Sequence, residues 1–294
     1  MRTLPHIAAR VFNTPLLLDS AKAEVILAAV GDRLGVSSFT NIDGLTVPVR
    51  GPQMAIEDEG YLAADRETDS GYDVLKGIAK IDVFGTLVQK SGYLRPCSGM
   101  TGYDGIRQNY LQALDDSDVK AIAIDLNSPG GEVPGCFDLV DLMYETRGEK
   151  PVWAICNEYA YSAAYAIASA CDYITVPRTG GVGSVGAVWI HMDFSKAIED
   201  AGVKVTLVKY GDRKMEGNPY EAMSEPAKDR FQKSIDMVGE LFVDTVARNR
   251  GLSTKKVRDT EAGCFLAAEG VELGLADSVM APDAAFRALL KKIA

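Results

Sequence analysis

The stretch VKAIAIDLNSPGG, residues 119–131, decides the fold class of this chain. Its first part, Val119 to Leu126, is almost wholly apolar, which is typical of a strand buried on both faces of a sheet. The strand runs into Ser-Pro-Gly-Gly and then, after Pro134, into a helical pattern. Two glycines after a strand let the backbone expose N–H groups that can stabilise an oxyanion. An ordinary tight turn between a strand and a helix has the same pattern, so both interpretations stay open here.

Strands and helices alternate on both sides of this stretch. The hydrophobic pattern predicts strands at 80–83, 151–156, 173–176, 185–190 and 203–208, and helices at 103–114, 136–147, 163–170 and 196–201. A long helix is expected to begin at Ser224, whose side chain can cap it, with Pro226 in the first turn. Alternating strands and helices predict an α/β domain.

The first 76 residues differ from the rest in composition. Apolar residues at helical spacing predict an amphipathic helix over 21–34, within an N-terminal helical segment at 1–41. Residues 42–76 are poor in apolar runs, and 57–73 contains seven acidic residues against one arginine. This composition predicts a solvated acidic linker at 42–76, followed by one domain at 77–294.

Charge and cysteine usage exclude several classes of protein. The chain has 31 basic and 41 acidic residues, a formal net charge of −10, and no basic run, so we expect no nucleic-acid partner. No apolar run is long enough for a signal peptide or a membrane-spanning helix, so we expect an unexported protein without a membrane partner. Five widely spaced cysteines without a C-x-x-C pair predict reduced, mostly buried thiols in a cytosolic compartment. No ligand cluster is evident, so neither a metal nor an organic cofactor is expected.

Ser162 stands at a second junction between a strand and a helix. A serine at a helix N-terminus lies among unpaired N–H groups and at the positive end of the helix dipole, which favours an alkoxide and a tetrahedral oxyanion. The same position is that of an ordinary N-cap serine, and this second interpretation is the more frequent one for a serine taken alone.

An activating base for Ser162 has two candidates, because His6 lies in the N-terminal tail. His191 closes the predicted strand 185–190, where it is more simply a residue that caps a turn with Asp193. Lys214 lies in the polar loop Gly-Asp-Arg-Lys. A lysine acts as a base only when burial or nearby positive charge lowers its pKa, whereas a lysine in such a loop is usually solvated.

Taken in order, these motifs resemble the signal peptide peptidase A family of Ser–Lys peptidases. They are Ser-Pro-Gly-Gly after a buried strand, a serine at the next junction, Gly-Ser-Val-Gly at 183–186, and Gly-x-x-Lys about fifty residues beyond the serine. The resemblance covers roughly 78–280 and includes the ending at 268–277. Residues 5–17 and 214–220 look more specifically like the bacteriophage and prophage branch, whose members are capsid-assembly, or head-maturation, proteases.

The resemblance implies a role for four positions. Ser162 matches the nucleophile and Lys214 the general base, and the backbone N–H groups of Gly131 and Ala163 match the oxyanion hole. The fold would be the Clp protease/crotonase type, a spiral of stacked β-β-α units, here with an N-terminal helical arm and usually assembled into homo-oligomeric rings. The sequence departs from the family at Ser162-Ala-Ala, where Ser-Gly-Gly is common, so substrate approach there would be tighter.

We therefore expect a serine endopeptidase that processes scaffold, portal or capsid proteins, or its own chain, during head maturation. It would act in the host cytoplasm or inside the immature head. The absence of the membrane anchor of the bacterial enzymes favours the phage branch, and an end at Ala294, without a scaffold-like extension, implies a separate scaffold protein. Two alternatives stay open: a catalytically silent scaffold or minor capsid component, and an acyl-CoA-acting enzyme of the crotonase fold.

Overall fold

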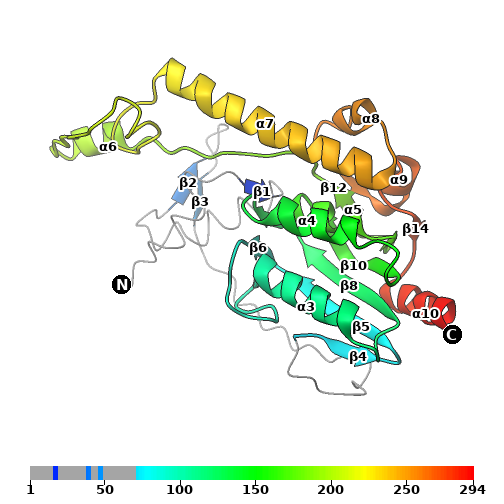
Figure 1. Ribbon diagram of the computed structural model, residues 1–294. Helices are drawn as coiled ribbons and strands as arrows, with labels where there is room; N and C mark the ends of the chain where they lie inside the picture. The colour runs from blue at the N-terminus through cyan, green and yellow to red at the C-terminus, as the bar shows by residue number, and fades with distance from the viewer. Residues whose placement is uncertain (1–15, 19–37, 41–45, 49–70) are drawn as a thin grey trace.

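The structure is a computed structural model that describes residues 16–18, 38–40, 46–48 and 71–294 (Figure 1). The amphipathic helix predicted at 21–34 lies outside these residues. Within the predicted N-terminal helical segment and acidic linker, the described residues form short strands: β1 (Leu16–Leu18), β2 (Ser38–Thr40) and β3 (Thr46–Pro48). β2 and β3 pair antiparallel as a two-stranded sheet.

An eight-stranded sheet forms the centre of the domain, in the order β13-β12-β10-β8-β5-β4, with β11 beside β10 and β14 beside β11. Its strands are β4 (Asp73–Leu75), β5 (Ile78–Phe84), β8 (Ala121–Ser128), β10 (Val152–Tyr161), β11 (Tyr173–Val176), β12 (Gly181–Gly183), β13 (Cys264–Leu266) and β14 (Ser278–Val279). β5, β8 and β10 run parallel. All but one residue of β8 are buried, as its apolar sequence predicts.

A second, four-stranded sheet has the order β1-β9-β6-β7. Its remaining strands are β6 (Thr86–Val88), β7 (Met100–Gly102) and β9 (Gly130–Glu132). β6 and β9 each follow a strand of the main sheet and precede a helix, α3 (Tyr103–Asp115) or α4 (Cys136–Glu145). The expected α/β class is therefore confirmed, and two β-β-α units are present.

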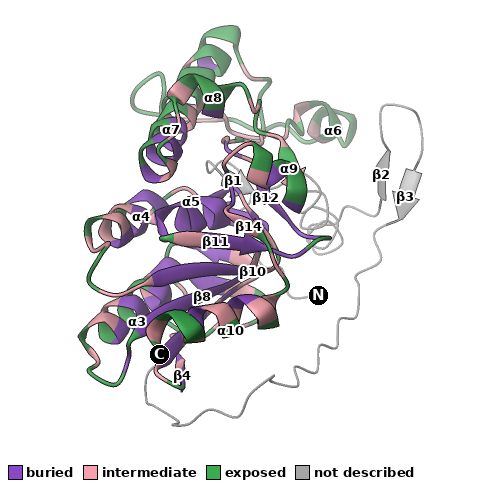
Figure 2. Ribbon diagram, turned by 90° about the vertical axis from the view of Figure 1, so that its right-hand side faces the viewer, coloured by how far each residue is buried: buried purple, intermediate pink, exposed green. Residues whose placement is uncertain are grey.

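The two faces of the main sheet carry separate cores. Ile122 and Ile124 of β8 belong to the larger core, under α3, α4, α5 (Ala163–Ala170) and the second half of α7 (Glu225–Arg250). Ala121 and Ala123 alternate with these isoleucines along β8, so they lie on the opposite face of the sheet. There they belong to the smaller core, against α10 (Pro282–Ile293). Figure 2 shows the buried strands β8 and β10 between α5 and α10. Because both faces are covered, β8 and β10 form the interior of the domain.

The predicted helices agree well with the structure, including α6 (Ser195–Asp200). Ser224 caps α7 as expected, because its Oγ accepts from the Ala227 N–H at 3.4 Å, with Pro226 in the first turn. Two short helices, α8 (Thr254–Arg258) and α9 (Ala267–Glu272), complete the C-terminal part.

One predicted boundary and two predicted strands differ from the structure. The sheet begins at β4, inside the predicted linker, because β4 pairs antiparallel with β5. The strand expected at 185–190 does not form, since Gly183 and Ser184 have positive φ angles of 120° and 56° that turn the chain away after β12. The strand expected at 203–208 does not form either: its alternating residues Val203 and Val205 are exposed, with no partner strand among the described residues.

Residues 186–224, which we call the arm, leave the sheet after β12 and return as α7. Figure 1 shows the part of the arm around α6 beyond the N-terminal end of α7, away from the main sheet. The Trp189 ring stacks on Phe231 of α7 at 4.0 Å between centroids. Arg230 Nε donates to Glu216 at 3.0 Å, so the arm is held by the first half of α7.

Candidate active site

Ser162 lies between β10 and α5 in a backbone conformation that L-residues rarely adopt, with φ 55° and ψ −121°. Both of its backbone groups are bonded: the N–H donates to the Gly183 carbonyl at 2.8 Å, and the carbonyl accepts from Ala166 at 2.9 Å. These two bonds hold the residue in place. Strain of this kind persists only where the surroundings impose it, and it is frequent at functional sites.

The side chain of Ser162 is not a helix cap. The residue is 1% exposed, and its Oγ has no hydrogen-bond partner among the described residues. The N-cap interpretation, which the sequence favoured for a serine taken alone, is therefore wrong, because the side chain accepts no hydrogen bond from the N–H groups of the first helical turn. A buried hydroxyl without a partner is costly, so it calls for a functional explanation.

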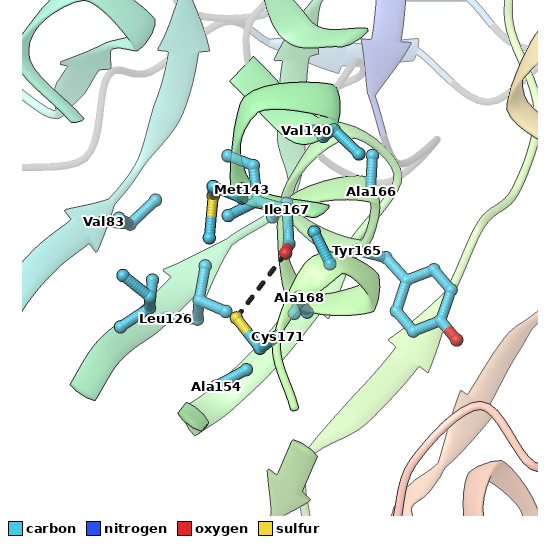
Figure 3. Close-up of a cluster of buried hydrophobic side chains, with 14 of the residues drawn as sticks. Val83, Leu126, Val140, Met143, Ala154, Tyr165, Ala166, Ile167, Ala168 and Cys171 are labelled. Carbon is cyan, nitrogen blue, oxygen red and sulfur yellow. Dashed lines mark hydrogen bonds between the residues drawn. The ribbon is translucent and has the colours of Figure 1, made fainter. Parts of the chain in front are cut away.

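Helix α5 fixes the position of Ser162 because all eight of its residues are buried. Figure 3 shows side chains of neighbouring elements, Leu126 and Met143 among them, gathered around Ile167 of α5. Five of its eight residues are alanine, which lets the helix pack closely against α4 and α7. At its other end, the Arg147 guanidinium donates to the carbonyls of the last residues, so both ends of α5 are anchored.

Gly131 and Ala163, the predicted oxyanion donors, lie on elements that contact each other. Gly131 is the middle residue of β9, and Ala163 is the first residue of α5, which packs on β9. Gly131 is pressed against β6: a Cβ there would lie 1.9 Å from the Leu87 carbonyl oxygen. Only glycine fits, so the close approach of two backbones explains the second glycine of Ser-Pro-Gly-Gly.

Cys136, at the start of α4, is a thiol close to this helix start, with Sγ 3.9 Å from the Ala163 carbonyl oxygen. Burial raises the pKa of the Cys136 thiol to about 12, so the group is protonated at neutral pH. A protonated, buried thiol is a poor nucleophile. Ser162 is therefore the better candidate of the two.

Lys214 lies in the turn at 211–217 of the arm and is exposed. Its backbone N–H donates to the Gly211 carbonyl at 3.2 Å. Since Ser162 Oγ has no partner among the described residues, the single chain does not bring the Lys214 ammonium to the serine. The predicted pair thus lies on two separate parts of the molecule, with Ser162 in the core and Lys214 on the arm.

His191 does not pair with Ser162 either. Its ring stacks on Trp189 at 5.6 Å between centroids, in line with the Trp189–Phe231 stack. Neither ring nitrogen has a hydrogen-bond partner among the described residues. The expected cap with Asp193 is corrected as well, because the Asp193 carboxylate accepts from the Ser195 N–H at 2.8 Å instead.

A half-buried charge cluster on the α10 face of the main sheet was not predicted as a site. Lys80 Nζ lies 2.7 Å from Asp82 and 3.3 Å from Asp125, two carboxylates that are register neighbours on β5 and β8. Burial raises the pKa of Asp125 to about 6, although Lys80 opposes this shift. Asp125 belongs to the quoted stretch 119–131, but nothing in the sequence indicated that Lys80 would face it.

Residues 71–294 and the three short strands contain no group of three or more His, Cys, Asp or Glu side chains that could hold a metal ion. None of the five cysteines forms a disulfide, and three of them are buried. Among the described helices, none is long and apolar enough to cross a membrane.

The geometry defines an α/β protein with a candidate serine nucleophile at a strained junction between a parallel strand and a buried helix. Residues 145–293 match the model of peptidase family S49, and the chain belongs to this family.

Two phage proteins are similar to the chain over 95% of its length. The Head-tail preconnector protein GP5 of Enterobacteria phage P21 is 41% identical over 279 residues, and Capsid assembly protease C of Escherichia phage lambda is 38% identical over 285 residues. The chain spans 56% and 64% of these relatives. A solved structure of a ClpP1 mutant from Listeria monocytogenes aligns with a TM-score of 0.41 and 13% identity, covering 68% of this chain and 90% of that one.

Proposed function

We propose that the chain is a serine endopeptidase that processes proteins during the assembly of a phage capsid. The observation that carries the proposal is the buried, strained and unpartnered Ser162 at the start of α5. Membership of peptidase family S49 and the similarity to Capsid assembly protease C support it. The proposed substrates are scaffold, portal or capsid proteins, or the chain itself, in the host cytoplasm or inside the immature head.

The proposed reaction uses four groups of this chain. Ser162 Oγ attacks a peptide carbonyl while the neutral amine of Lys214 takes the hydroxyl proton. The N–H groups of Gly131 and Ala163 stabilise the negative charge that develops on the carbonyl oxygen. Lys214 then gives its proton to the leaving amine. The Lys214 amine then activates a water molecule, which attacks the ester between the substrate and Ser162 and regenerates the serine.

Assembly of several copies is the proposed route by which Lys214 reaches Ser162. The arm is exposed, and it carries large apolar side chains that the single chain leaves uncovered: Val203, Val208 and Tyr210, of which Tyr210 is fully exposed. Packing of these side chains between copies in a homo-oligomeric ring would bury apolar surface and move the arm toward a serine. The dyad is then completed in the assembly.

Cleavage of co-expressed head proteins, followed by mass spectrometry of the fragments, tests this function. Ser162→Ala and Lys214→Ala should both abolish cleavage, because a nucleophile and its base act as a unit. Lys209→Ala is the matched control, since Lys209 is another exposed lysine of the arm whose ammonium bonds only the Asp212 carbonyl of the same loop among the described residues. Its cleavage should match wild type.

Labelling with a serine-directed fluorophosphonate separates the alternatives. The peptidase should be labelled at Ser162, whereas an acyl-CoA hydratase or a silent capsid component should not. If His191→Ala is inactive and Lys214→Ala is active, a histidine base replaces the lysine. Cleavage that persists in Ser162→Ala overturns the assignment of the nucleophile.

A further inference from the structure

A segment more than a hundred residues away in sequence pairs with the strand that carries the candidate oxyanion donor. β1 (Leu16–Leu18) lies antiparallel to β9, with Leu16 opposite Glu132, Leu17 opposite Gly131 and Leu18 opposite Gly130. The middle residue of β1 is thus the direct neighbour of Gly131. Figure 1 shows β1 beside the helices α4 and α5 and apart from β2 and β3.

The two edges of β9 have different partners. β6 pairs with one edge of β9 through Leu87 and Gly131, and the tight contact at Gly131 leaves no space for another strand at that edge. β1 takes the other edge. α5, which begins directly after Ser162, packs on the same short strand. The edge that β1 covers is therefore the edge at which an added peptide can pair with β9 beside the candidate nucleophile.

A peptidase substrate can use this edge. A peptide that runs alongside β9 as an extended strand brings its main chain close to Gly131, and main-chain hydrogen bonds to an open strand edge are a common way to bind peptides. β1 has the features of such a peptide: it is extended, antiparallel and apolar, with the sequence Leu-Leu-Leu.

We propose that β1 is an internal competitor that occupies the peptide-binding edge of β9. Access then requires release of β1, and the preferred substrates are extended segments with apolar side chains at the positions of Leu16 to Leu18. This inference rests on the proposed peptidase function and adds to it a substrate class and an autoinhibitory contact.

Peptide binding to Ser162→Ala tests the competition without any chemistry. The probe is a fluorescein-labelled peptide with the sequence of residues 14–19, and its Kd is measured by fluorescence polarisation. The second substitution, Leu17→Pro, removes a backbone N–H from β1 and disfavours the strand. If β1 covers the edge in about nine of ten molecules, its release should lower the apparent Kd about tenfold. Val11→Pro, outside β1, is the matched control and should leave the Kd unchanged.

Two results overturn the inference: an unchanged Kd in Leu17→Pro, or equally tight binding of a control peptide with proline in place of its middle leucine. Amide hydrogen exchange gives an independent readout should Leu17→Pro perturb folding. In the Ser162→Ala protein, the amides of 16–18 should be protected and should lose protection when the peptide binds, and protection that persists in the complex also refutes the proposal.

The proposed function and this inference fail separately. Cleavage by wild type with no competition between β1 and the peptide removes the inference alone. Competition without cleavage by wild type keeps the binding edge and removes the peptidase.

Discussion

Replacing Ser162 by glycine should stabilise the folded chain while removing the candidate nucleophile. The φ of 55° and ψ of −121° at this residue are readily adopted by glycine but strained for serine. Backbone strain of this kind costs about 1–3 kcal/mol, and a buried hydroxyl without a partner costs a similar amount. Both costs are present in the wild-type chain and both disappear in Ser162→Gly.

The size of the effect follows from these contributions. Ser162→Ala removes the unpartnered hydroxyl but keeps the strain, so its free energy of unfolding should rise by about 1 kcal/mol. Ser162→Gly also relieves about 2 kcal/mol of strain, of which about 1 kcal/mol is lost to the greater freedom of glycine in the unfolded chain. A total gain of about 2 kcal/mol corresponds to a rise in Tm of about 4–8 °C for a protein of this size.

Urea denaturation and thermal melting of wild type, Ser162→Ala and Ser162→Gly measure this series. Ser253→Gly is the matched control, because Ser253 is an N-cap with an ordinary φ of −73° whose side chain accepts from the Lys256 N–H. There the glycine should destabilise by a few tenths of a kcal/mol. If Ser162→Gly is less stable than wild type, or if both glycine variants shift alike, the argument from strain is refuted.

Three further substitutions test the surroundings of the site. Because burial raises the pKa of Asp125 to about 6, the folded state keeps that proton longer than the unfolded state does. The free energy of unfolding of wild type, compared with that of Asp125→Asn, should therefore fall as the pH rises from about 4 to 6, by at most about 1.4 kcal/mol per pH unit. Urea titrations that give the same difference between the two proteins at every pH would contradict this. Gly131→Ala should lower the free energy of unfolding by about 1–3 kcal/mol, because its Cβ would meet the Leu87 carbonyl oxygen; an unchanged urea midpoint would speak against the tight contact. Arg147→Met should cost about 3 kcal/mol by leaving carbonyls at the end of α5 unpaired, and Arg147→Lys should recover part of that loss in the same urea assay.

The sequence predicts the main-sheet strands well because a strand that is buried on both faces is a continuous run of apolar residues. β8 is apolar on both faces, and α5 is rich in small residues, so strand and helix can be identified without knowledge of their neighbours. Residues 203–208 carry an equally good strand pattern and form no strand in the structure. Alternation predicts that a segment can pair, but it does not supply the partner.

The candidate site is predicted in its residue identities but not in its geometry. A serine before a helix is the same in sequence whether or not its side chain caps the helix. The difference at Ser162 arises from the bond between its N–H and the Gly183 carbonyl, twenty-one residues on. Contacts at that range, like the one between β1 and β9, depend on the tertiary fold and leave no local pattern.

The two halves of the candidate dyad differ in what must unfold to move them. Ser162 is joined to a helix with all its residues buried, so its displacement requires the cooperative loss of the central domain. Lys214 belongs to an arm held on α7 by one aromatic stack and the Glu216–Arg230 pair, which can open as a smaller, sub-global unit. Heating should therefore release the arm from α7 reversibly, some degrees below the temperature at which the main sheet melts.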